Sequence, residues 1–241
     1  MRNDGVKQDA LARSEELSGA WPGPLRAAVF DVGETLVDET TEYGAWADWL
    51  GVPRHTFSAI FGAVLAAGQD SRQVFQRIRP GFDLDLERRR RAEAGVPETF
   101  GSDDLYPDAR RCLAALRAQR LIVGIAGNQT ARAEELLRGL DLPADWIGTS
   151  AGWGVEKPSP AFFSRLVGEC GCRPGQVAYI GDRLDNDVGP AHRVGLVAVH
   201  VRRGPWAHVV PGSGSGGDLE VEGLAELPER LLEFDRRRRP L

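Results

Sequence analysis

The chain has 241 residues, 42% of them hydrophobic and 27% charged, which is typical of a globular protein with one core or with a core and a small second domain. A net charge of −5 argues against a general nucleic-acid-binding protein, so we expect no nucleic-acid partner. No apolar run approaches the ~20 residues of a membrane span, and the polar N-terminal residues lead into no apolar signal core. These features predict a cytoplasmic location without a membrane partner.

Cysteine and lysine are both scarce in this sequence. Three cysteines, an odd number without a nearby histidine cluster, predict reduced thiols rather than a disulfide framework or a zinc site. Lysine occurs only at Lys7 and Lys157, whereas the other 28 of the 30 basic residues are arginine. Because arginine does not replace lysine where a compact point charge is needed, Lys157 is a candidate functional residue.

The predicted elements begin with a polar N-terminal arm, residues 1–24, which ends in a helix-breaking Trp-Pro-Gly-Pro run. Residues 26–31 are expected to form the first strand. Between residues 40 and 103, apolar side chains recur at the i, i+3, i+4 spacing of helices in four segments, which predicts a small helical insert. The arginine run at 88–91 is expected to lie on a solvated helix face.

Strands and helices alternate after the insert. The predicted elements are a helix over 109–120, a strand over 121–126, a helix over 130–140, a short strand over 146–149, a helix over 160–170, a strand over 177–180, a helix over 188–194, a strand over 196–201, a flexible Gly/Ser loop over 211–217, an edge strand over 219–221 and a helix over 224–234. This alternation predicts an α/β fold with a doubly wound parallel sheet. Its core would comprise residues 25–39 and 104–235, and residues 40–103 would form the small second domain.

Polar residues follow three of the predicted strands or lie in the loops near them. Asp31 ends the first strand, Asn128 follows the second, and Asp182 and Asp187 follow the strand over 177–180. Open α/β sheets bind ligands beyond the carboxyl ends of their strands. Together with Lys157, this set offers a nucleophile, an ammonium group and an acidic metal pocket.

In this order and spacing, these segments resemble the four motifs of the haloacid dehalogenase-like (HAD) superfamily. The matching segments are Phe30-Asp31-Val32-Gly33-Glu34-Thr35-Leu36 for the Asp-x-Asp-x-Thr motif, Gly127-Asn128 at the Ser/Thr motif, Lys157-Pro158 at the lysine motif, and Gly181-Asp182 with Asp187 at the acidic motif. The resemblance covers about residues 26–235. It implies a Rossmann-type core, with the insert as a helical cap between the first and second motifs.

The resemblance also implies a hydrolase with covalent catalysis. Asp31 would attack the substrate and form an aspartyl intermediate. Asp31, Asp182 and the carbonyl of Gly33 would hold Mg²⁺, with Asp187 as a further metal residue, because hard oxygen ligands suit this ion.

Phosphate binding is implied for a second group of residues. Lys157 would neutralise Asp31 and the phosphate, and the backbone N–H groups of the turn from Asp31 to Gly33 and of Asn128 would bind phosphate oxygens. The expected substrate is a small-molecule phosphate ester, because a closing cap would enclose a small molecule and exclude bulk water.

Two positions depart from the family pattern. In the phosphatases of this family, an Asp two residues after the nucleophile protonates the leaving oxygen and then activates water, but Gly33 stands there, and loss of such assistance typically costs ~10²–10⁴ in rate. Gly127 lacks a hydroxyl donor to the phosphate, a hydrogen bond worth roughly 1.5–3 kcal/mol. Glu34, Asp38 or a cap residue is expected to carry the proton instead, with a bias toward good leaving groups such as aryl or acyl phosphates.

Three alternatives follow from the same departures. A 2-haloacid dehalogenase also lacks the second Asp but works without a metal, so the intact Asp182 and Asp187 argue against it. A phosphonatase needs a cap lysine, and the insert contains none, which excludes that activity. A non-catalytic HAD-like protein that binds a ligand or partner stays open, although the retained Asp31 and Lys157 favour an enzyme.

Overall fold

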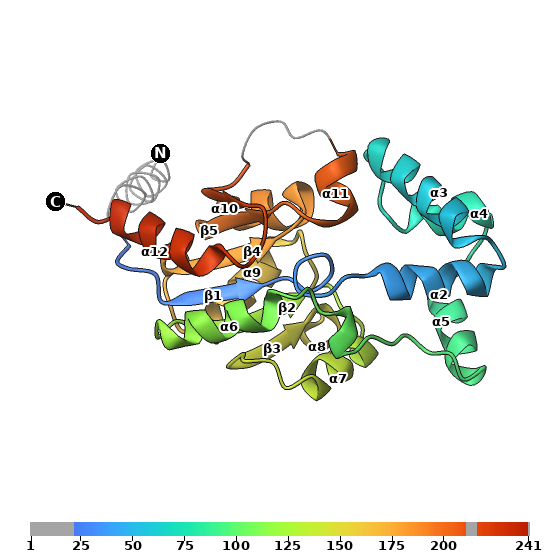
Figure 1. The fold of residues 1–241 in the computed structure, drawn as a ribbon, viewed down its shortest axis with the longest axis horizontal. Coiled ribbons are helices and arrows are strands. Elements are labelled where there is room, and N and C mark those ends of the chain that lie inside the picture. The colour runs from blue at the N-terminus through green and yellow to red at the C-terminus, as the bar shows by residue number, and fades with distance from the viewer. Residues whose placement is uncertain (1–21, 211–215, 241) are drawn as a thin grey trace, which may run out of the picture.

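The computed structural model describes residues 22–210 and 216–240, and a parallel sheet forms the centre of the fold (Figure 1). Its strands are β1 (Ala27–Phe30), β2 (Ile122–Gly127), β3 (Trp146–Thr149), β4 (Val177–Gly181), β5 (Val197–Val201) and β6 (Leu219–Val221). The strand order is β3-β2-β1-β4-β5-β6, and every neighbouring pair is parallel. The order reverses direction between β1 and β4, which is where ligands bind in open α/β sheets.

Helices cover both faces of the sheet, because its central strands are apolar on both sides. Within β1, Ala28 and Phe30 belong to one buried cluster, and Ala27 and Val29 belong to the other. The helices of the first cluster are α6 (Ala109–Ala118), α7 (Ala131–Gly139) and α12 (Leu227–Arg237), and those of the second are α9 (Pro160–Cys170) and α10 (Gly189–Arg193). The predicted doubly wound α/β fold is therefore confirmed.

A third apolar cluster lies outside the sheet, within the four helices that the periodicity predicts for the insert. These helices are α2 (Thr40–Leu50), α3 (Arg54–Ala66), α4 (Gln73–Ile78) and α5 (Leu84–Glu93). Their core is aromatic, with Trp46 packed edge-on against Phe75 at 5.1 Å and Phe75 stacked on Phe82 at 5.0 Å between ring centroids. In Figure 1 the four helices stand beyond the end of the sheet where β1 leads into α2.

Two backbone segments connect these helices to the sheet, and they run side by side. Val37 forms an antiparallel bridge with Leu105. The N–H of Asp38 donates to the carbonyl of Asp104 at 2.8 Å, and the N–H of Tyr106 donates to the carbonyl of Leu36 at 3.0 Å. The insert is thus attached to the sheet through a short paired strip of backbone.

Several short elements were not predicted. These are η1 (Ser102–Asp104), α8 (Ser150–Trp153), η2 (Pro174–Gln176), α11 (Gly204–Val209) and a π-helical turn, η3 (Leu184–Val188). The last of these leads directly into α10, which corresponds to the helix predicted over 188–194. Trp206 of α11 packs edge-on against Phe61 of α3 at 5.6 Å. Helix α11 therefore connects the sheet region to the insert.

One prediction about the insert is wrong. Arg91 is only 2% exposed, although the arginine run was expected to face solvent. Its guanidinium pairs with Glu42 at 2.7 Å and lies 4.2 Å from the ring centroid of Trp46, because the helix turns this arginine inward over the aromatic core. The predicted N-terminal arm and Gly/Ser loop fall largely outside the described residues. Among the described helices, none combines the length and apolar character needed to cross a bilayer.

Candidate active site

The residues predicted from the strand ends lie together at the carboxyl edge of the sheet. Asp31 follows β1 and Asp182 follows β4, which is its neighbour in the sheet. Lys157, from the loop between α8 and α9, places its Nζ 2.6 Å from Oδ1 of Asp31 and 2.5 Å from Oδ1 of Asp187. All four side chains are buried, so these charges interact with little screening by solvent.

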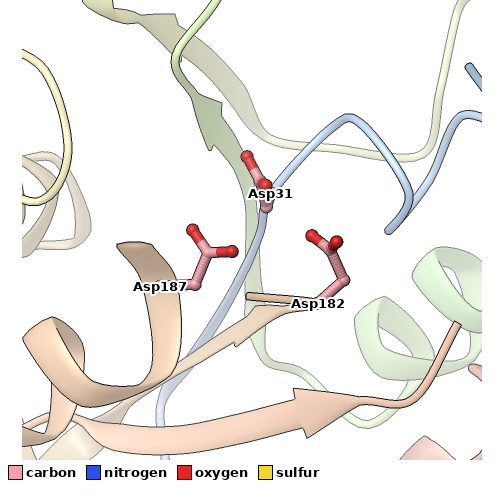
Figure 2. Close-up of side chains that lie close together, drawn as sticks. All are labelled: Asp31, Asp182 and Asp187. Atoms are coloured by element: carbon pink, nitrogen blue, oxygen red, sulfur yellow. The ribbon is translucent and has the colours of Figure 1, made fainter. Parts of the chain in front are cut away.

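Three carboxylates converge in this group, as Figure 2 shows. One oxygen from each of Asp31, Asp182 and Asp187 lies within 4.8 Å of the others. Oδ2 of Asp182 is buried and has no hydrogen-bond partner among the described residues. A hard divalent cation such as Mg²⁺ fits this donor set, because it would satisfy that oxygen and balance three carboxylates that face a single ammonium.

Burial and neighbouring charges shift the pKa values of Asp182, Asp187 and Lys157. Burial, with the charges of Asp187 and Asp31, raises the pKa of Asp182 well above its usual range. Burial also raises the pKa of Asp187 to about 6, although Lys157 opposes this shift. Burial alone would lower the pKa of Lys157, but Asp187 and Asp31 raise it well above the ordinary value, so the ammonium stays charged.

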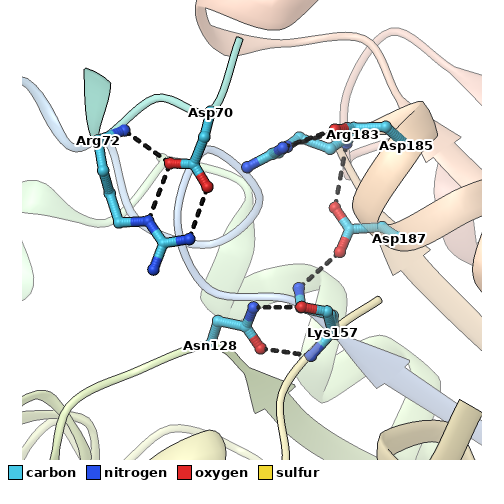
Figure 3. Close-up of polar contacts among 7 residues, drawn as sticks. All are labelled: Asp70, Arg72, Asn128, Lys157, Arg183, Asp185 and Asp187. Carbon is cyan, nitrogen blue, oxygen red and sulfur yellow. Dashed lines mark hydrogen bonds and ion pairs between the residues drawn. The ribbon is translucent and has the colours of Figure 1, made fainter. Parts of the chain in front are cut away.

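Asn128 reaches the site in a way that the sequence did not predict. Its side-chain amide donates to the carbonyl of Lys157 at 2.9 Å and accepts the N–H of Lys157 at 2.8 Å (Figure 3). The amide thereby fixes the backbone of the loop that carries the lysine. Gly127, immediately before, leaves room for the Asp31 carboxylate, because a Cβ there would overlap Oδ1 of Asp31.

Glu34 and Asp38, which the sequence suggested in place of the acid–base Asp missing at position 33, are both engaged in other hydrogen bonds. The carboxylate of Glu34 accepts the hydroxyl of Tyr106 at 2.6 Å, and that of Asp38 accepts the N–H of Thr40 at 2.8 Å. Both side chains are therefore engaged in holding the turn and the start of α2. The prediction that one of these two carries the proton is not supported by their contacts.

Glu39 is the carboxylate that the sequence reasoning missed. A Cβ built on Gly33 would lie 2.5 Å from Oε1 of Glu39, so this side chain fills the space beside the glycine. Burial, followed by the charges of Glu34 and Asp31, raises the pKa of Glu39 to about 8. In the sequence, Glu39 stands out only as one of several acidic residues that begin with Glu34. Acidic residues are favoured near a helix N-terminus, which explains this group equally well.

His200 also approaches the site, although the sequence assigned it no role. Its Nε2 lies 3.1 Å from the carbonyl oxygen of Asp182, and the residue is 8% exposed. Since a carbonyl only accepts, Nε2 carries the hydrogen in this contact. The ring therefore fixes the backbone that presents the Asp182 carboxylate.

A cleft of about 1640 Å³ separates this edge of the sheet from the insert. Asp31, Gly33, Asn128, Lys157 and Asp182 all line it, whereas Asp187 is fully buried behind the lysine. Glu39, just before the insert, also lines the cleft, and the insert contributes Tyr43 and the loop between α3 and α4, whose Asp70 and Arg72 pair with each other and face the sheet in Figure 3. Drug-sized pockets measure roughly 300–1,000 Å³, so the cleft is wider than a small ester requires.

A Rossmann-type parallel sheet with carboxylates and a lysine at its carboxyl edge suits a hydrolase that uses a carboxylate nucleophile, and sequence comparison identifies its family. The family profile described as haloacid dehalogenase-like hydrolase matches residues 25–195, and the chain belongs to this family of hydrolases. The membership predicted from the four motifs is confirmed.

Two relatives and one solved structure illustrate the similarity. The glyceraldehyde 3-phosphate phosphatase of Pyrococcus furiosus is 30% identical over 234 residues, which cover 88% of this chain and 94% of that protein. The protein of the same name from Methanopyrus kandleri is 33% identical over 133 residues, and the match spans only 54% of this chain and 57% of that relative. The crystal structure of HAD-hydrolase YfnB from Bacillus subtilis, bound to magnesium, has a TM-score of 0.65 at 20% identity, covering 86% of this chain and 99% of that one, and supports the fold alone.

Proposed function

We propose that the protein is a Mg²⁺-dependent phosphatase that hydrolyses a small phosphorylated metabolite through an aspartyl-phosphate intermediate. The observation that carries this proposal is the contact of Asp31 with Lys157 in a cluster that also contains Asp182 with its unsatisfied oxygen. Relatives named phosphatases support the reaction class.

Each buried residue has a distinct part in the proposed reaction. The Asp31 carboxylate attacks phosphorus and takes up the phosphoryl group. The ammonium of Lys157 offsets the repulsion between this carboxylate and the incoming phosphate dianion, and Asn128 holds the lysine loop in place. Asp187 pairs with the Lys157 ammonium and accepts the backbone N–H of Arg183. These contacts keep Lys157 directed at the nucleophile.

Mg²⁺ would be held by Asp31, Asp182 and the Gly33 carbonyl, with Asp187 close behind. When bound, the ion supplies positive charge that neutralises the carboxylates and the transferring phosphoryl group. The unpartnered Asp182 oxygen is the structural support for this assignment.

Helices α2–α5 are proposed to act as a cap over the cleft. They have their own aromatic core and are joined to the sheet through the paired backbone strip at Val37 and Leu105, so they can move as a unit once the contact between Trp206 and Phe61 breaks. The cleft is wider than a small ester needs, which fits closure upon substrate. Because two relatives are named glyceraldehyde 3-phosphate phosphatase, three-carbon phosphate esters are the first substrates to test.

The test is a substrate panel measured with Mg²⁺ and with chelator. The panel contains an aryl phosphate, glyceraldehyde 3-phosphate, phosphoglycolate and a 2-haloacid. We expect phosphate release only with Mg²⁺, and its loss in Asp31→Asn but not in the exposed control Asp103→Asn. Halide release in chelator would identify a dehalogenase, and absence of any turnover would favour a binding protein; either result would overturn the proposal.

A further inference from the structure

The space beside Gly33 is occupied by a carboxylate from another residue. A Cβ on Gly33 would lie 2.5 Å from Oε1, 2.7 Å from Cδ and 3.1 Å from Oε2 of Glu39. A side chain at position 33 would therefore project directly into the Glu39 carboxylate. The fold thus places a carboxylate from the start of α2 in the space that a side chain at position 33 would occupy.

The backbone around Glu39 holds this arrangement in place. Its N–H donates to Oε1 of Glu34 at 3.3 Å, and its carbonyl accepts the N–H of Tyr43 at 3.0 Å in the first turn of α2. Glu34 is in turn fixed by the hydroxyl of Tyr106. Glu39 therefore stands on a defined turn rather than on a loose loop.

The carboxylate itself is uncommitted. Among the described residues it has no hydrogen-bond donor and no ion-pair partner, in contrast to Glu34 and Asp38 on either side of the same turn. It lines the same cleft as Asp31 and Lys157. The carboxyl of Glu39 is half-buried and accessible from this cleft, which is where an acid–base group must lie to reach a bound substrate.

We propose that Glu39 is the acid–base residue of this enzyme and serves in place of a side chain at position 33. The inference rests on the proposed phosphatase function. In the first step the Asp31 oxygen forms a bond to phosphorus, the bond from phosphorus to the leaving oxygen breaks, and that oxygen takes its proton from Glu39. In the second step a water oxygen attacks the aspartyl phosphate, Glu39 accepts its proton, and the electron pair of the broken bond returns to Asp31.

This assignment changes the expected substrate range. With a proton donor present, alkyl phosphates with poor leaving groups are substrates, and the bias toward aryl and acyl phosphates expected from Gly33 alone disappears. The substrate class is therefore alkyl phosphate monoesters, such as phosphorylated sugars or hydroxy acids.

The test measures kcat/KM in Mg²⁺ for a series from nitrophenyl phosphate to an alkyl phosphate. We expect Glu39→Gln to lose about 10²–10⁴-fold on the alkyl phosphate and less than about tenfold on the nitrophenyl ester, because only the poor leaving group needs the proton. Nitrophenolate should then appear as a burst, since slow hydrolysis of the intermediate follows fast transfer. The neighbouring neutralisation Asp38→Asn is the matched control and should leave the leaving-group dependence unchanged.

A double variant guards against a trivial loss of folding. Glu39→Ala frees the space beside position 33, so adding Gly33→Asp should recover at least about tenfold of the alkyl phosphatase activity of Glu39→Ala. Equal losses on both esters in Glu39→Gln, or no recovery in the double variant, would overturn the role of Glu39. If the wild-type protein shows no Asp31-dependent hydrolysis of any ester, the proposed function itself is wrong and this assignment falls with it.

Discussion

The buried charge of Lys157 is expected to contribute strongly to stability. The substitution Lys157→Met removes this charge and keeps a long apolar side chain. The ammonium lies 2.6 and 2.5 Å from two carboxylate oxygens, and Lys157 is 3% exposed. Removing one partner of a buried ion pair typically costs about 3–5 kcal/mol, and two partners place this lysine at the upper end. For a protein of this size each 1 kcal/mol shifts Tm by about 2–4 °C, so we expect Tm to fall by roughly 10–20 °C in chelator.

Two further arms of this experiment follow from the charge of the cluster. Mg²⁺ should stabilise the variant more than the wild type, because a cation that binds the folded state replaces the missing positive charge. The pKa of Asp187 is about 6 with Lys157 present and rises further without it. Protonation of Asp187 at low pH therefore offsets the loss of the ammonium. The loss of stability in the variant is largest near pH 8 and shrinks toward pH 5.

Melting curves and urea unfolding in chelator and in Mg²⁺ measure these effects. Arg165→Met is the control, because its ion pair with Glu169 is exposed and such pairs contribute about 0–1 kcal/mol. A deficit below about 1 kcal/mol at pH 8 in chelator, or equal stabilisation of both proteins by Mg²⁺, would refute the reasoning.

Three other predictions concern single positions. Gly127→Ala should lower kcat by about 100-fold and lower Tm by less than Lys157→Met does, because its Cβ displaces the Asp31 carboxylate that pairs with Lys157; steady-state kinetics and a melting curve check this. Arg91→Leu should cost about 3–5 kcal/mol in urea unfolding, since the partly buried Glu42 loses the cation that pairs with it, whereas an exposed arginine of the same helix should cost little. Native protein should react with one equivalent of a thiol reagent, at Cys172, because burial raises the pKa of the other two thiols to about 12.

The sequence predicted the sheet and the central cluster because both depend on strand periodicity. Asp31 and Asp182 follow short apolar runs that pair as neighbours, so their side chains had to meet at one edge. Lys157 could be recognised because the chain has almost no other lysine.

Other features depend on side-chain direction, which periodicity does not encode. Arg91 belongs to a run of four arginines, and only the packing of its helix turns it over Trp46. Glu39 precedes a helix, and its approach to Gly33 depends on the turn that Glu34 and Tyr106 hold. Helix α11 is too short for a periodic signal.

The paired strip at Val37 and Leu105 has a consequence for the timing of the reaction. Glu39 comes just beyond the strip on the side of the helices, whereas Asp31 precedes it and is anchored to the sheet. If the helices pivot about this strip, the proposed proton carrier Glu39 travels with them and the proposed nucleophile Asp31 stays behind. Opening would then separate Glu39 from Asp31 and let product leave. Each turnover would begin only after the helices close over the sheet again.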